Sequence, residues 1–262
     1  MDIRLVVTDL DGTFLSPDRT ISDRAVETVA KLRERGVLFT FITGRPWCGA
    51  ERYALRAGID IPAITCNGAV INNGYDMIWR SPMLLEPLRE ILERAVQEGL
   101  TVLYSQAGRE AAMSETDWTR QRNYTIHLPS EEEWKTLTAD KVNLISGEKT
   151  AEFVQISTKF DKLRDRYQFV CYTDTGCEIA GAGVTKASAL ERYAASQNIP
   201  MAQVMAIGDN ENDLEMLRLA GTGAAVGNAT ASAKAAADYI CRASNTDGVV
   251  EAIEKFCLGV EA

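Results

Sequence analysis

The sequence of 262 residues contains a single histidine, His127, and six cysteines without a Cys-x-x-Cys pair. A zinc cluster needs several such ligands at short spacing, so this kind of site is disfavoured. Positive charge is also scarce: 28 lysines and arginines face 37 acidic residues, for a formal charge of −9. Nucleic acids and anionic membranes attract basic surfaces, and we therefore expect neither as a partner.

Long apolar runs are missing as well. No stretch is long enough to span a membrane, no secretory segment is recognised near the first residues, and no repeat occurs. Together with the scattered cysteines, these features predict a reduced, cytoplasmic protein. The hydrophobic content of 46% is that of an ordinary core, and the length allows one large domain or two smaller ones.

The first informative motif is a pair of carboxylates after a predicted buried strand. Asp9 and Asp11 follow Leu-Val-Val at positions 5–7, and Gly12 indicates a sharp exit from the strand. Ligands of open α/β sheets bind beyond the carboxyl ends of the strands. Two carboxylates only two residues apart repel each other, which favours a bound cation. An EF-hand is disfavoured because its glycine stands sixth, whereas Gly12 stands fourth. Taken alone, the motif also suits an exposed turn.

Further polar residues follow the other predicted strands. Strands over 37–42, 63–65 and 203–207 alternate with helices, which predicts a parallel sheet with right-handed crossovers. Thr43 can be explained as a helix N-cap, Lys186 as a surface lysine, and the acidic group after 207 as a helix start. Their common position at one sheet edge favours a site instead. The residues concerned are Thr43, Gly44, Lys186, Asp209, Asn212 and Asp213.

Between residues 83 and 181 the predicted strands and helices no longer alternate as in a parallel sheet. We predict helices over 84–98 and 148–166, with short strands over 101–105, 111–114, 142–146 and 168–173. The fold class is therefore α/β: a Rossmann-like parallel core over 1–82 and 182–262, with an inserted α+β cap over 83–181. Within the cap, the ring- and arginine-rich stretch 118–127 either contacts substrate or is ordinary structure.

Four short motifs follow one another along the chain: Asp-Leu-Asp-Gly-Thr at 9–13, Ile-Thr-Gly-Arg at 42–45, Gly-Val-Thr-Lys at 183–186 and Gly-Asp-Asn-Glu-Asn-Asp at 208–213. This set resembles the haloacid-dehalogenase-like superfamily, and within it the Cof-type sugar-phosphatase branch. Asn67-Gly68-Ala69 and residues 245–249 also look like family features. The sequence departs from the family pattern at Ala187, where glycine is frequent, and at Ala180-Gly181, where proline is common.

The resemblance implies a mechanism and a metal. Asp9 is the expected nucleophile, forming an aspartyl phosphate, and Asp11 the expected general acid and base. Magnesium is expected on Asp9, the backbone carbonyl of Asp11 and Asp209. The remaining expected roles are phosphate or substrate binding by Thr43, the backbone of Gly44, Lys186 and Asn212, and support of the metal water or of Lys186 by Asp213.

Three functions remain open at this point. The favoured one is Mg-dependent hydrolysis of a small phosphorylated metabolite, with a sugar phosphate as the expected substrate. A phosphomutase can use the same aspartyl phosphate, and release of free phosphate separates the two. A non-catalytic regulator that binds sugar phosphates is disfavoured, because Asp9, Asp11 and Asp209 are all present.

Overall fold

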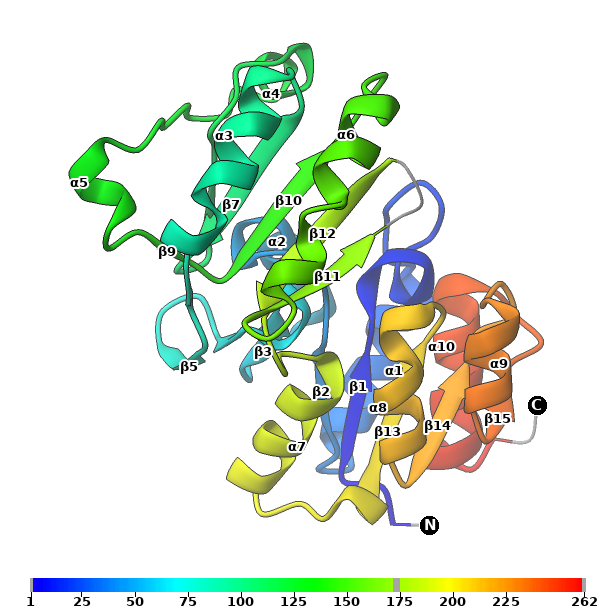
Figure 1. The fold of residues 1–262 in the computed structure, drawn as a ribbon. Coiled ribbons are helices and arrows are strands. Elements are labelled where there is room, and N and C mark those ends of the chain that lie inside the picture. The colour runs from blue at the N-terminus through cyan, green and yellow to red at the C-terminus, as the bar shows by residue number, and fades with distance from the viewer. Residues whose placement is uncertain (1, 172–174, 261–262) are drawn as a thin grey trace. The chain divides into compact units, whose positions relative to one another are not determined.

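The structure is a computed structural model that describes residues 2–171 and 175–260. The chain divides into two compact units (Figure 1). One, here called the core unit, contains Met1–Ile78 and Thr185–Ala262, and the other, the inserted unit, contains Trp79–Val184. In the part of the chain that the structure describes, no helix is both long and apolar enough to cross a membrane.

A five-stranded parallel sheet forms the centre of the core unit, in the order β15-β14-β13-β1-β2. Its strands are β1 (Leu5–Thr8), β2 (Leu38–Phe41), β13 (Val204–Gly208), β14 (Thr222–Ala225) and β15 (Tyr239–Ile240). Leu5 lies opposite Leu38 of β2 on one side and Val204 of β13 on the other. From β1 the chain continues to β2 on one side of the sheet, and from β13 it continues to β14 on the other side. The boundary between β1 and β13 is therefore the switch point at which such sheets bind ligands.

Six helices of the described residues belong to the core unit: α1 (Asp23–Glu34), α2 (Trp47–Ala57), α7 (Lys186–Ser196), α8 (Leu214–Leu219), α9 (Ala231–Ala236) and α10 (Asn245–Ile253). They form two groups, because α1 contacts α2 and α10, whereas α8 contacts α7 and α9. Right-handed crossovers that leave β1 and β13 in opposite directions place α1 and α8 on opposite faces of the sheet. Helix α1 buries an apolar stripe that includes Val29 and Leu32.

The third predicted parallel strand, over 63–65, needs a correction. β3 (Ala63–Thr65) meets the parallel sheet only through one bridge, between Ile42 and Ile64. Its regular partner is the antiparallel β4 (Val70–Asn72), which is followed by β5 (Met77–Arg80) in a small separate sheet. The reason is the turn after β3, where Cys66 and Asn67 both have φ of 52° and send the chain straight back.

The inserted unit contains a five-stranded antiparallel sheet in the order β11-β12-β10-β7-β8. Its strands are β7 (Thr101–Gln106), β8 (Arg109–Ala112), β10 (Lys141–Ile145), β11 (Tyr167–Cys171) and β12 (Gly176–Gly181), and β6 (Met83–Leu84) pairs with β9 (Thr138–Ala139) apart from it. Its helices are α3 (Arg89–Gln97), α4 (Asp117–Gln121), α5 (Glu131–Trp134) and α6 (Thr150–Ser157). Alternate residues such as Val102 and Val142 pack with Leu92 of α3 and Phe153 of α6 in one apolar core.

Two predicted helices of this unit were too long. The α-helix predicted over 84–98 begins only at Arg89 and ends at Gln97. A 3-10 turn, Glu86–Leu88, precedes it, with Pro87 near its start, where the missing N–H costs no hydrogen bond. The helix predicted over 148–166 ends at Ser157. There the hydroxyls of Ser157 and Thr158 donate to backbone carbonyls of the last turn, and only a short 3-10 turn, Phe160–Leu163, follows.

One central strand, β12, was not predicted from the sequence. It contains glycine at both ends, a composition that disfavours strands, and it is held by hydrogen-bonded neighbours on both sides. The strand predicted over 168–173 is β11, which ends at Cys171; residues 172–173 lie outside the described residues.

Candidate active site

Asp9 stands at the carboxyl end of β1, where its N–H continues the strand ladder by donating to the carbonyl of Ile207 at 2.9 Å. The chain then makes one wide turn, Leu10–Phe14, in which Gly12 has φ of +81°. The turn ends on Phe14, which is buried against Phe39 and Phe41 with ring centroids 5.4 and 5.7 Å away. This packing buries the end of the turn against β2.

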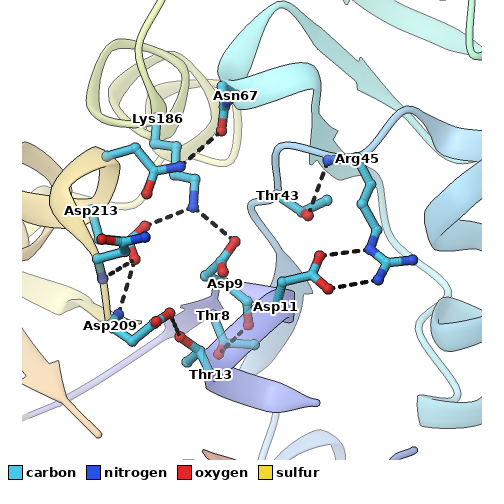
Figure 2. A network of polar contacts seen from close by, with 12 residues as sticks. Thr8, Asp9, Asp11, Thr13, Thr43, Arg45, Asn67, Lys186, Asp209 and Asp213 are labelled. Atoms are coloured by element: carbon cyan, nitrogen blue, oxygen red, sulfur yellow. Dashed lines mark hydrogen bonds and ion pairs between the residues drawn. The ribbon is translucent and has the colours of Figure 1, made fainter. Parts of the chain in front are cut away.

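Lys186 is the first residue of α7 and is 1% exposed. Its Nζ donates to Oδ1 of Asp9 and to Oδ1 of Asp213, at 2.7 Å each (Figure 2). Thr185 caps the helix reciprocally with Ser188 and so sets the position where the lysine enters the site. Burial alone would lower the pKa of Lys186, but the two carboxylates outweigh it and raise that pKa, so the ammonium stays charged.

Asp209 and Asp213 follow β13, the neighbour of β1. One oxygen of the fully buried Asp213 accepts the backbone N–H groups of Asp209, at 2.9 Å, and Asn210, at 3.1 Å. Its other oxygen holds Lys186. Thr13 donates to Oδ1 of Asp209 at 2.5 Å, which ties the loop after β1 to the loop after β13. Asp213 therefore shapes the loop and orients the lysine at once.

Asp9, Asp209 and Asp213 form an acidic cluster in which one ligand oxygen from each lies within 4.8 Å of the others. Burial raises the pKa of Asp9 to about 7 despite Lys186, and Asp213 and Asp209 add to the rise. Burial and Asp213 also raise the pKa of Asp209, against its hydrogen bond from Thr13. One lysine does not balance three carboxylates, and an oxygen-only donor set fits a hard divalent cation such as Mg²⁺.

Asp11 points to the other side of the loop, toward Arg45 (Figure 2). Nε of Arg45 donates to Oδ2 of Asp11 and Nη2 to Oδ1, at 2.6 Å each. Burial raises the pKa of Asp11, but the hydrogen bonds and charge of Arg45 outweigh it and lower that pKa below its usual value. In this structure Asp11 is thus a carboxylate that is paired outside the acidic cluster.

The remaining predicted residues surround this centre. Thr43, which is fully buried after β2, accepts the N–H of Arg45 at 3.2 Å, and its carbonyl accepts the N–H of Asn67 at 2.9 Å. Gly44 lies against Asn67, since a Cβ on it would stand 3.1 Å from Oδ1 of that side chain. Asn212 donates to the same Oδ1 at 3.1 Å and is exposed. All eight predicted residues therefore belong to the core unit, with Asn212 at the outer edge of the group.

Several partners in this site were not assigned a role from the sequence. These are the hydroxyl of Thr13, the guanidinium of Arg45, and two amides, Asn228 and Asn245, that donate to the carbonyl of Gly12 at 2.7 and 2.9 Å. Thr13, Arg45 and Asn245 belong to the motifs named above, so the sequence could have pointed to them. Asn228 belongs to none of the motifs, and the sequence did not point to it.

A family model for haloacid dehalogenase-like hydrolases matches residues 6–253 of this chain. The chain belongs to this family, as the four motifs indicated.

Its relatives are phosphatases. The pyridoxal phosphate phosphatase YbhA of Escherichia coli is 29% identical over 274 residues, covering 97% of this chain and 98% of that protein. A phosphoglycolate phosphatase of Methanoculleus marisnigri is 30% identical, with 97% of each chain covered. A haloacid dehalogenase-like hydrolase of Bacteroides thetaiotaomicron has a similar structure, with a TM-score of 0.84 at 26% identity, over 97% of this chain and 99% of that one. These matches confirm that the chain is an enzyme of the phosphatase type.

Proposed function

We propose that this protein is a Mg²⁺-dependent phosphatase that hydrolyses a small phosphorylated metabolite, a sugar phosphate in first place, through an aspartyl phosphate on Asp9. The observation that carries the proposal is the arrangement at the switch point: a buried lysine holds one oxygen of Asp9, and Asp209 and Asp213 surround it. The relatives' printed substrates, pyridoxal phosphate and phosphoglycolate, share one feature, a phosphate ester on a small molecule.

The first half-reaction transfers the phosphoryl group to the enzyme. Oδ1 of Asp9 is held by Lys186, and the other oxygen, Oδ2, attacks phosphorus while the ester P–O bond breaks. Lys186, Thr43 and the backbone of Gly44 neutralise or hydrogen-bond the phosphoryl oxygens, and Asn212 contacts phosphate or substrate from the outer edge. Asp213 has the supporting role: it holds Lys186 and the loop that carries Asp209.

Asp11 moves the protons in both half-reactions. It donates one to the departing oxygen and then takes one from the water that attacks the aspartyl phosphate, which frees phosphate and restores Asp9. Its bidentate pairing with Arg45 suits the second step, in which Asp11 must start as a carboxylate. The first step requires Arg45 to release at least one of its oxygens, so that Asp11 can carry a proton.

The metal assignment follows the acidic cluster. Asp9 and Asp209, with the backbone carbonyl of Asp11, would hold Mg²⁺, and the ion would supply charge neutralisation for the transferring phosphoryl group. Asp213 is a poorer ligand than the other two carboxylates, because its oxygens already accept hydrogen bonds from Lys186 and two backbone N–H groups.

We assign substrate selection to the inserted unit, whose residues 83–181 the sequence predicts as a cap domain. We assign the protein to the cytoplasm, as its scattered cysteines suggest. In the stretch 118–127, the rings of Trp118 and Tyr124 pack at a tilt of 33° with centroids 5.4 Å apart, and Cζ of Arg122 lies 4.1 Å from the centroid of the Trp118 ring. Tyr124 also donates to Glu110 at 2.6 Å. Replacing Trp118 by alanine should change the ranking of sugar phosphates while leaving a small aryl phosphate nearly unaffected. Equal losses on all substrates would mean that the stretch is only structural.

The decisive experiment compares the wild type with Asp9→Asn on a panel of phosphorylated metabolites, with and without Mg²⁺. The wild type should release inorganic phosphate only with the metal. The variant should fold normally, because Asp213 still pairs with Lys186, yet show no turnover, since an amide is not a nucleophile. Near-normal turnover by the folded variant would exclude Asp9 as the nucleophile. Conversion of a sugar phosphate to its isomer without phosphate release would indicate a phosphomutase instead.

A further inference from the structure

Two cysteines of the inserted unit face each other across neighbouring strands. Cys171 ends β11 and Cys177 lies near the start of β12, and the two are directly opposite in the antiparallel register. The Sγ atom of Cys171 lies 3.1 Å from that of Cys177 and donates its proton to it. Cys171 is exposed, whereas Cys177 is buried.

This arrangement meets the geometric requirements of a disulfide. Residues directly opposite in an antiparallel pair have Cα atoms roughly 4.5–5.5 Å apart, within the range of about 4.4–6.8 Å that disulfides span. The sulfur atoms already point at each other, so the bond needs side-chain adjustment and no change of strand register. Both residues belong to one unit, and its sheet holds their backbones in place.

We propose that Cys171 and Cys177 are a thiol-oxidation site that forms a reversible intrachain disulfide by exchange with a small disulfide such as oxidised glutathione. The accessible Cys171 reacts first: its thiolate attacks one glutathione sulfur, the S–S bond breaks, and one glutathione thiolate leaves. The thiolate of Cys177 then attacks Sγ of Cys171 and expels the second glutathione. The two protons lost by the cysteines end on the two glutathione thiols, and reduced glutathione reverses the sequence.

The surroundings of the two cysteines determine which sulfur reacts first. Burial raises the pKa of Cys177, and the hydrogen bond from Cys171 adds to the rise, while Arg164 opposes it. The Cys177 thiol also donates to the carbonyl of Glu178 at 3.4 Å. Cys177 is therefore a poor first nucleophile, and a mixed disulfide on Cys171 places a good target directly beside it.

The test uses the peptide that trypsin releases. Residues 167–186 contain both cysteines and no internal lysine or arginine, so one peptide reports the pair. The whole protein is equilibrated with reduced and oxidised glutathione at several ratios, alkylated, digested and analysed by mass spectrometry. In reducing buffer this peptide should carry two alkyl groups. In oxidising buffer it should carry none and be lighter by two hydrogen atoms than the free dithiol, and dithiothreitol should reverse the change.

Variants separate the two steps. Cys177→Ser should stop after the first exchange and accumulate a glutathione adduct on Cys171, whereas Cys171→Ser should form little adduct on the buried Cys177. The matched control is Cys48→Ser, which removes another exposed cysteine and should leave the 167–186 disulfide unchanged. The proposal is overturned if the wild-type peptide keeps two alkyl groups, or holds a stable glutathione adduct, at ratios that glutathionylate Cys48. Because that result comes from the wild type, it does not depend on the folding of any variant.

Discussion

The guanidinium of Arg45 binds both carboxylate oxygens of Asp11, with two N–O distances of 2.6 Å. A bidentate pair of this kind is stronger and more strictly oriented than a single hydrogen bond. Arg45 is itself placed by its position after Thr43 and lies 5.1 Å from the centroid of the Tyr53 ring. The loop after β2 therefore controls the charge and direction of a side chain that follows β1.

Replacing Arg45 by methionine should shift the acidic limb of the pH–rate profile to higher pH. Burial raises the pKa of Asp11, and Arg45 is the main group that lowers it. Without the arginine, Asp11 stays protonated to a higher pH and is lost as the base of the second step. The measurement is kcat against pH with a sugar phosphate. Arg52→Met is the matched control, because Arg52 also lies over the Tyr53 ring, 4.5 Å from its centroid, without pairing with Asp11. An identical shift in both variants would contradict this role of Arg45.

Asp11→Asn should separate the two half-reactions. A sugar alkoxide is a strongly basic leaving group, and loss of a general acid typically costs on the order of a hundred- to ten-thousand-fold in rate. An aryl phosphate needs little protonation, so its first step should survive while hydrolysis of the aspartyl phosphate remains slow. Rapid-mixing assays should show a burst of aryl alcohol near one equivalent per enzyme, together with acid-stable, base-labile protein phosphate. Equal losses on both substrates without a burst would exclude Asp11 as the acid and base.

Magnesium binding should weaken as the pH falls below neutrality. Burial raises the pKa of Asp9 to about 7 in the metal-free protein, so below that pH a proton occupies an expected metal ligand and must be released. Affinity should then fall by about tenfold for each pH unit. Calorimetric titrations with Mg²⁺ at pH 6 and pH 8, in buffers of different ionisation enthalpy, measure both the affinity and the released proton. Equal affinity at both pH values, with no proton release, would contradict the assignment of Asp9 as a ligand.

Gly12→Ala should damage the site more than the fold. A Cβ on Gly12 would lie 2.5 Å from Oδ2 of Asp209, at φ of +81°, so the carboxylate must move. Gly36→Ala is the matched control, because Gly36 has φ of +72° and a Cβ added to it would meet no atom within 4 Å. Both variants should lose about 1–2 kcal/mol of unfolding free energy from the left-handed backbone, as measured by urea denaturation. Only Gly12→Ala should also lose Mg²⁺ affinity and phosphate release; equal activity in the two variants would mean that Asp209 adjusts freely.

The parallel core was predictable because its signals are local. The apolar strand at residues 5–7 depends on neighbouring residues, and polar residues after parallel strands meet at one edge of the sheet. The eight predicted site residues lie in the core unit for this reason. Local patterns predicted α6 too long, because side-chain hydroxyls at its end bind the backbone carbonyls. They missed β12, because this strand is stabilised by hydrogen bonds to neighbouring strands on both sides.

The exact pairings between distant residues were decided by the tertiary structure. The family resemblance implied that Asp213 supports either the metal water or Lys186. The fold adds that Lys186 lies between Asp9 and Asp213, which are 177 and 27 positions away along the chain. Likewise, no pattern shows that Arg45 turns to Asp11, or that Cys171 faces Cys177. The free energy of such contacts depends on burial and on distances of a few ångströms. Burial and interatomic distances are set only when strands pair and helices pack, so they cannot be read from the order of residues.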